Sequence, residues 1–430
     1  MAMAWKRRAK SKAKPATEIP EIAVPPHFRC PISLELMKDP VTACTGITYD
    51  RQSIEGWLQR GHITCPVTHQ QLRSDELLPN LVLTRMIQSW CGAHRDAGVE
   101  RIPTPKIPLS APQAEELLSE LAAFARRRDA GRCEQLAARV RALARESERN
   151  RRCLASNGAG RVLAAAFSAF AANYAELPEL LEGVLAAMAA AGMATDDEAA
   201  SFLAAPEPLN LLAEMLRHGS LAARLNAAMA VKSLLATTSS KPISELVSAT
   251  EGMVEALAKL VKEPISQQAM KASLAAIYYM VSEDEGAAES VVEQGVVPAL
   301  VEVLTEPERG MCEKALAVLE GVLSCERGRA AACSHALAVP ALAKRMFRVS
   351  EAATELAVSA LWKLCGDCGK CSREAVQVGA FPKLLLLLQI GCGEETKERA
   401  TQLIKFLNEN CSGKNIECAD TMDFKGLNKL

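Results

Sequence analysis

The chain has 430 residues, of which 49% are hydrophobic and only 4% aromatic, and its formal net charge is −1. This balance gives no global attraction to nucleic acid or to an anionic membrane, and no run of about 18 apolar residues could cross a bilayer. The fifteen cysteines lack the spacing of a disulfide framework, and no apolar stretch follows the basic N-terminus. We therefore expect reduced thiols and a cytoplasmic or nuclear protein with neither a membrane span nor a nucleic-acid partner.

Residues 1–23 carry a basic run from Lys6 to Lys14. Such a run is typical of a solvated, disordered tail, and a nuclear-localisation patch is the alternative. We predict a flexible tail here, ahead of the first folded segment.

Residues 24–98 contain two short segments that each begin with a cysteine. Cys30 is followed three residues later by Ser33, and Cys65 is followed three residues later by Thr68. A structural zinc site needs four cysteine or histidine ligands, and neither hydroxyl replaces a thiolate. The sequence therefore predicts no metal and no cofactor. We call the segment that begins at Cys30 the first corner and the one that begins at Cys65 the second corner, and we expect hydrogen bonds and packing to hold both.

Local patterns between these corners predict a small ββα unit. Val41 to Tyr49 alternates about Gly46, which indicates a hairpin. Asp50 is expected to be the N-cap of a helix that ends at Gly61, and Asn80 the N-cap of a second helix. Because a unit of this size buries little surface, we expect charged hydrogen bonds among the acidic residues and Arg51 to support it.

The segment from Pro25 to Arg95 resembles the U-box family, the zinc-free counterpart of the RING-type ubiquitin ligases. The resemblance rests on CPISLELM from Cys30, DPV from Asp39, GITYDR from Gly46, CPVT from Cys65 and LPN from Leu78. The positions that it marks as structural in the U-box are Cys30, Asp39, Pro40, Tyr49, Asp50, Arg51 and Cys65.

The remainder of the chain is repetitive. After a predicted linker at 99–112, Pro298, Pro340 and Pro382 follow one another at steps of 42 residues, each at the start of a helical run. This period resembles armadillo repeats, so we expect an all-α solenoid of about six repeats over 113–411, followed by a flexible tail at 412–430. The predicted fold is thus mostly α, with a small ββα U-box ahead of the solenoid. The pairing is similar to the short subgroup of plant U-box ubiquitin ligases.

The resemblance implies an E3 ubiquitin-protein ligase that forms no covalent ubiquitin intermediate. It places the surface that binds a ubiquitin-charged conjugating enzyme at Ile32, Leu34, Trp57 and Pro66. His69 stands where many such ligases have an arginine that orients ubiquitin. A protein substrate in the armadillo groove, auto-ubiquitination, a homodimer through the U-box, and a role in plant stress or immune signalling are further implications.

The sequence leaves two alternatives open. An armadillo adaptor with a weak or inactive U-box would account for a histidine at position 69, where many such ligases have an arginine.

The string Cys365, Cys368 and Cys371 suggests a metal site. The repeat register, however, places Cys365 in the core and the other two cysteines in a loop without a fourth ligand, which favours no metal. Cys44 and Cys91 have no acidic or histidine neighbour typical of a covalent transfer cysteine.

Overall fold

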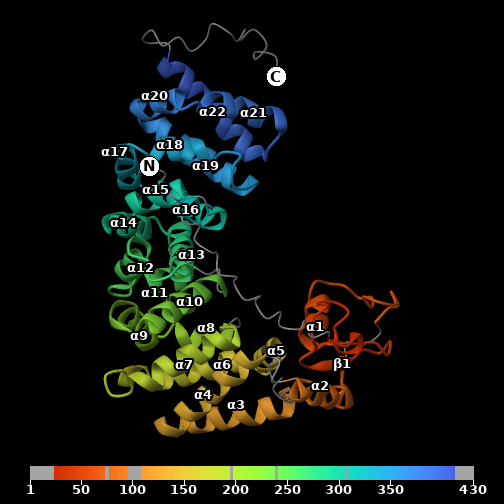
Figure 1. The fold of residues 1–430 in the computed structure, drawn as a ribbon. Coiled ribbons are helices and arrows are strands. Elements are labelled where there is room, and N and C mark those ends of the chain that lie inside the picture. Colours follow the sequence, from red (N-terminus) through yellow and green to blue (C-terminus); the bar gives the residue numbers. More distant parts are fainter. Residues whose placement is uncertain are drawn as a thin grey trace, which may run out of the picture. The chain divides into compact units, whose positions relative to one another are not determined.

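The computed structural model describes residues 24–72, 77–94, 108–193, 197–237, 241–306 and 308–411. The chain divides into an N-terminal unit, residues 1–107, and a C-terminal unit, residues 108–430 (Figure 1). The predicted tails at 1–23 and 412–430, and residues 99–107 of the predicted linker, lie outside the described residues.

The N-terminal unit contains a small antiparallel sheet and two helices. Its strands have the order β2-β1-β3, with Val41 of the central strand facing Tyr49 on one side and Pro79 on the other. The elements in chain order are η1 (Pro26–Phe28), β1 (Pro40–Thr42), β2 (Thr48–Asp50), α1 (Arg51–Gln59), β3 (Leu78–Pro79) and α2 (Leu81–Ala93). The predicted ββα arrangement is confirmed, and β3 adds a short edge strand.

Local chemistry explains where these elements begin and turn. Gly46 has φ +78° in the hairpin turn, a left-handed conformation that glycine adopts without strain. The Asn80 side chain accepts a hydrogen bond from the Leu83 N–H at 3.0 Å, as expected of an N-cap. Tyr49, Ile54 and Ile87 form the centre of a core that joins the sheet to both helices.

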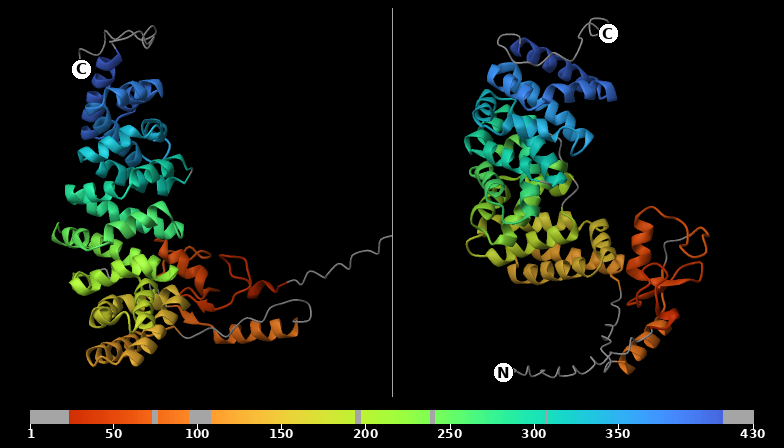
Figure 2. Two further views of the ribbon diagram at one scale, coloured as in Figure 1. Left: turned by 90° about the vertical axis from the view of Figure 1, so that its left-hand side faces the viewer. Right: turned by 45° about the horizontal axis from the view of Figure 1, so that its top comes forward.

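The C-terminal unit is a stack of helices that follow one another in chain order, as the views in Figures 1 and 2 show. A leading pair is formed by α3 (Ala111–Arg126) and α4 (Ala130–Glu146). Six triplets follow, and in each we call the members the first, second and third helix. The α3 helix begins two residues before the expected start of the repeats, at a capping box made by Ser110 and Gln113.

The helices of the triplets have these bounds. The first helices are α5 (Glu148–Ser156), α8 (Asp197–Leu203), α11 (Lys241–Ala249), α14 (Glu285–Glu293), α17 (Glu326–Ser334) and α20 (Gly369–Gln377). The second helices are α6 (Ala159–Phe170), α9 (Pro206–His218), α12 (Met253–Lys262), α15 (Val296–Thr305), α18 (Ala338–Arg345) and α21 (Ala380–Ile390). The third helices are α7 (Pro178–Ala191), α10 (Leu221–Thr237), α13 (Gln267–Glu283), α16 (Arg309–Val322), α19 (Glu351–Asp367) and α22 (Glu394–Cys411). A short η3 (Ala171–Asn173) follows α6.

A glycine with positive φ separates the first from the second helix in several triplets. Gly295 (φ +68°) and Gly379 (φ +76°) follow α14 and α20, where glycine commonly ends a helix. The equivalent residue between them is Leu337, which keeps a right-handed backbone with φ −99°. The helix boundaries therefore recur every 42 residues, while the backbone conformation of the turn differs between glycine and leucine.

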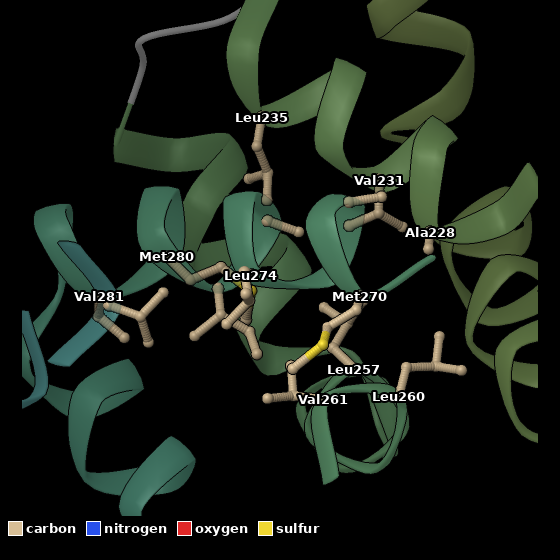
Figure 3. Close-up of a cluster of buried hydrophobic side chains, with 14 of the residues drawn as sticks. Ala228, Val231, Leu235, Leu257, Leu260, Val261, Met270, Leu274, Met280 and Val281 are labelled. Carbon is tan, nitrogen blue, oxygen red and sulfur yellow. The ribbon is translucent and has the colours of Figure 1, made fainter. Parts of the chain in front are cut away.

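The core continues from one triplet to the next through the third helices. The α4 helix of the leading pair packs on α7, and each third helix then packs on the following one as far as α22. Figure 3 shows one such joint, where side chains of α10, α12 and α13 interleave, among them Val231, Leu257 and Leu274. A single triplet could not bury this surface alone, which explains why the fold needs a stack.

In the part of the chain that the structure describes, no helix is both long and apolar enough to cross a membrane.

Candidate functional site

The two cysteine corners of the N-terminal unit share one backbone conformation. In the first, the Leu34 N–H donates to the Cys30 carbonyl and the Cys30 N–H to the Glu35 carbonyl, both at 2.8 Å. In the second, His69 donates to Cys65 at 3.0 Å and Cys65 to the Gln70 carbonyl at 2.8 Å. Leu34 (φ +60°) and His69 (φ +58°) are equivalent residues with left-handed backbones.

The Cys65 sulfur is the hydrogen-bond acceptor that organises the second corner. Its Sγ is fully buried and lies 3.0 Å from the Tyr49 hydroxyl, 3.4 Å from the Thr45 hydroxyl and 3.3 Å from the Thr68 N–H. Burial raises the pKa of this thiol, but the hydrogen bonds from Thr45, Thr68 and Tyr49 together outweigh burial and hold the pKa at about 6. The corner thus keeps a sulfur with thiolate character and surrounds it with donors where a RING would place a metal.

The Cys30 sulfur has the same role in the first corner. Its Sγ accepts the Asp50 N–H at 3.3 Å. Burial raises the pKa of Cys30, and hydrogen bonds from the Ser33, Asp50 and Ile32 backbone lower it further than burial raises it. Because Tyr49 and Asp50 are consecutive in β2, this one strand binds both corners.

An ion pair and a bound carboxylate connect the first corner to α1. The Arg51 Nε donates to the Asp39 Oδ2 at 2.6 Å, and Arg51 is almost fully buried. Asp50 is the N-cap residue of α1, as predicted, but its side chain caps nothing. Its Oδ1 instead accepts the Lys38 and Asp39 N–H groups at 2.7 and 2.9 Å, so a tertiary contact replaces the expected capping bond.

The residues predicted to bind a conjugating enzyme lie at different depths. Leu34 is 71% exposed, whereas Ile32 and Pro66 are half-buried beside their cysteines. The helical spacing of Ile54 and Leu58 on the core-facing stripe of α1 predicts an exposed Trp57. In the structure Trp57 is half-buried and Ile54 is fully buried.

Trp57 supports the second corner as well as lining the surface. Its Nε1 donates to the Thr64 carbonyl at 2.8 Å, and its ring stacks on His62 with 4.0 Å between centroids. Helical spacing cannot reveal this bond, because it crosses a loop. Sequence reasoning also missed Thr45 as a donor to Cys65.

Each of the two units matches a known protein family. A model of the U-box domain matches residues 24–96, and one of the plant U-box protein ARM repeat region matches residues 113–429. The chain belongs to the plant U-box proteins.

Relatives of similar length support this assignment. U-box domain-containing protein 21 of Arabidopsis thaliana is 37% identical and the alignment covers 100% of both chains. U-box domain-containing protein 20 of the same plant is 40% identical over 90% of this chain and 88% of its own. E3 ubiquitin-protein ligase PUB23, also from Arabidopsis thaliana, is 33% identical over 90% of this chain and 93% of its own. Among solved structures, a designed armadillo repeat protein covers 54% of this chain and 94% of its own with a TM-score of 0.46 and 21% identity.

In this plant U-box protein the third helices of the last triplets are joined by polar side chains. The Ser359 hydroxyl of α19 donates to Glu320 of α16 at 2.7 Å and accepts from Arg399 of α22 at 2.9 Å. The Trp362 Nε1 donates to the Gln402 Oε1 at 2.7 Å. These bonds cross from one triplet to the next, so this face combines apolar rings, amides and paired charges.

Proposed function

We propose that the chain is an E3 ubiquitin-protein ligase whose U-box binds a ubiquitin-charged conjugating enzyme at the two corners and α1. The observation that carries the proposal is the intact hydrogen-bonded framework around Cys30 and Cys65, with the exposed Leu34 beside it. A folded adaptor would also need the corners for stability, but it would not need an exposed apolar residue such as Leu34 in the first corner. Named ligases among the relatives support the same class.

The proposed mechanism is one of positioning. Ile32, Leu34, Trp57 and Pro66 would contact the conjugating enzyme, and a substrate lysine would attack its thioester with no chemistry from the U-box. His69 is exposed and sits in the second corner at the place equivalent to Leu34. Its side chain would contact ubiquitin on the bound conjugating enzyme. An imidazole forms fewer hydrogen bonds than a guanidinium, so we propose a modest intrinsic activation.

We propose that no covalent ubiquitin–cysteine intermediate forms. Among the described cysteines only Cys44 is exposed, and the others are buried or half-buried. A transfer cysteine must be accessible to the incoming thioester. Cys44→Ala should therefore keep full activity, while a loss of activity with an intact fold would overturn this part of the proposal.

The substrate is proposed to be a protein that binds along the third helices, the predicted armadillo groove. The mixture of Trp362, Gln402 and paired charges on this face suits an extended peptide, which needs amide partners as well as apolar contacts. Auto-ubiquitination of the chain's own lysines should follow from the same proximity. We propose a cytoplasmic site of action, with the nucleus as the alternative, and a stress or immune role as in the named subgroup.

A homodimer through the U-box is a further part of the proposal. Leu78, Leu81, Val82 and Met86 are all exposed along β3 and the first turns of α2. A run of four exposed apolar side chains on so small a unit favours burial against a partner. Sedimentation of the full chain, compared with Val82→Glu, tests this assembly.

The experiment for the ligase itself is reconstituted ubiquitination. Full-length protein is incubated with activating enzyme, ATP, ubiquitin and a panel of conjugating enzymes. We expect ubiquitin conjugates with the wild type and none with Ile32→Ala or Trp57→Phe. Circular dichroism checks that both variants are folded. Trp57→Phe is preferred to alanine because it removes the bond to Thr64 while keeping a ring in place. No conjugates with any conjugating enzyme would favour the adaptor.

A further inference from the structure

Three cysteine sulfurs converge in the C-terminal unit, far along the chain from the U-box corners. The Sγ atoms of Cys333, Cys368 and Cys371 all lie within 4.8 Å of one another. The Cys371 thiol donates to the Cys333 Sγ at 3.1 Å. Among the described residues, no other group of three acidic, histidine or cysteine side chains gathers in this way.

The sequence-based placement of this string was wrong in two respects. Cys371 lies inside α20 and is buried, and Cys368 is the N-cap of the same helix, so the pair is not in a free loop. The third thiol comes from Cys333 near the end of α17, the first helix of the preceding triplet. Cys365 is a core residue, as expected.

The spacing suits a single soft cation. Thiolates that bind Zn²⁺ at about 2.3 Å in a tetrahedron have sulfurs about 3.8 Å apart. The observed separations, from 3.1 Å to at most 4.8 Å, bracket this value, so small side-chain rotations would complete the site. Cys333 and Cys368 are half-buried, which leaves an ion a route from solvent, while Cys371 forms the floor.

Binding of a cation by cysteine thiols displaces their protons, so metal binding at this cluster would be coupled to proton release.

We propose that Cys333, Cys368 and Cys371 bind one soft d¹⁰ cation of the Zn²⁺ class through three thiolates, with the fourth position open to water. The soft sulfur donors select such an ion over Mg²⁺ or Ca²⁺. Because α17 and α20 belong to consecutive triplets, the ion would clamp the last two repeats together. Binding only to the folded chain stabilises it, so this part of the solenoid gains stability when the ion is present.

The test uses full-length protein, fully reduced and then freed of reductant under nitrogen. Cd²⁺ is the probe, because its thiolate complexes absorb in the ultraviolet, and bound metal is counted after gel filtration. Cys368→Ser and Cys333→Ala remove one ligand each. Cys368→Ser is mild, since the Cys368 side chain makes no capping bond to α20. Cys392→Ser, another half-buried cysteine of the same unit, is the matched control for background thiol binding.

Wild type and Cys392→Ser should each hold one more equivalent of Cd²⁺ than Cys368→Ser and Cys333→Ala. Zn²⁺ should raise the Tm of the first two proteins by a few degrees and leave the two ligand variants unchanged. Equal metal content in all four proteins would overturn the proposal. It would also be overturned if the thiol count of wild type fell by two in air while its metal content matched that of the variants, since the cluster would then be a redox pair.

Discussion

The Tyr49 hydroxyl and the Cys65 sulfur lie 3.0 Å apart with both side chains fully buried. Tyr49 comes from the central hairpin and Cys65 from the second corner, so this bond ties the sheet to the loop that would hold zinc in a RING. The next residue, Asp50, makes the matching bond to Cys30 at 3.3 Å. One strand thereby replaces two metal ions as the element that holds both corners.

Tyr49→Phe should destabilise the N-terminal unit by about 1–2 kcal/mol, because it removes a buried hydrogen bond and keeps the ring. Urea unfolding followed by tryptophan fluorescence measures this, in a Trp362→Phe background where every tryptophan lies in residues 1–107. Tyr278→Phe, at an exposed tyrosine of the solenoid, is the control and should leave the unfolding of the N-terminal unit unchanged. Equal unfolding curves for Tyr49→Phe and the control would contradict the role given to this bond.

The stability that Cys65 contributes should depend on pH. Its pKa is about 6 in the folded chain and about 8.5 in an unfolded one, so its contribution is full above pH 8.5 and is lost as pH falls through 6. The difference in unfolding free energy between wild type and Cys65→Ser should therefore grow from pH 6 to pH 9, by at most about 3 kcal/mol. The same fluorescence titration at several pH values measures it. Cys44→Ser, at an exposed thiol, is the control, and a pH-independent difference for Cys65→Ser would refute the thiolate.

Gly321 of α16 should tolerate no side chain unless Val281 of α13 is shortened. A Cβ at Gly321 would lie 2.4 Å from the Val281 Cγ2, closer than side chains approach. Gly321→Ala should cost about 1–3 kcal/mol, and the double variant with Val281→Ala should recover part of the loss. Thermal unfolding by circular dichroism checks both. Gly310→Ala, in the first turn of the same helix with open space around it, should be neutral or stabilising, and a similar loss there would deny the contact.

His69→Arg should increase ubiquitin transfer by about fivefold, equivalent to about 1 kcal/mol from a charge-assisted hydrogen bond to ubiquitin. The left-handed backbone of residue 69 is adopted more often by histidine than by arginine, so the variant carries a small backbone cost that partly offsets the gain. Single-turnover discharge of a charged conjugating enzyme onto free lysine measures the rate. Gln70→Arg adds the same charge one residue further on, and equal acceleration by both would show a general charge effect instead.

The parts of the fold that local chemistry decides were predictable from the sequence. Gly46 requires a turn, Asn80 caps a helix with its own side chain, and the 42-residue step of Pro298, Pro340 and Pro382 reflects a stack of equal units. These signals lie within a few residues or repeat at a fixed interval. The family resemblance added the positions of the two corners.

The parts that depend on tertiary contacts were not predictable. Asp50 has two sets of N–H groups within reach, those of its own helix and those of Lys38 and Asp39, and only the folded chain shows that the second set is bound. The Trp57 bond to Thr64 depends on the path of a loop. Cys333 meets Cys371 across 38 residues, which is not the repeat step, so the period gave no sign of the contact.

Leu34 is the residue whose truncation best tests whether the corners and α1 form a docking surface for a charged conjugating enzyme. It is 71% exposed, so Leu34→Ala should leave the core intact. Leu221→Ala, at a 68% exposed leucine of the solenoid, is the matched control. In single-turnover discharge onto free lysine, which needs no substrate protein, we expect at least about a tenfold loss for Leu34→Ala, as for a contact residue worth more than about 1.4 kcal/mol. Leu221→Ala should match wild type. Equal rates for all three proteins would contradict this docking surface.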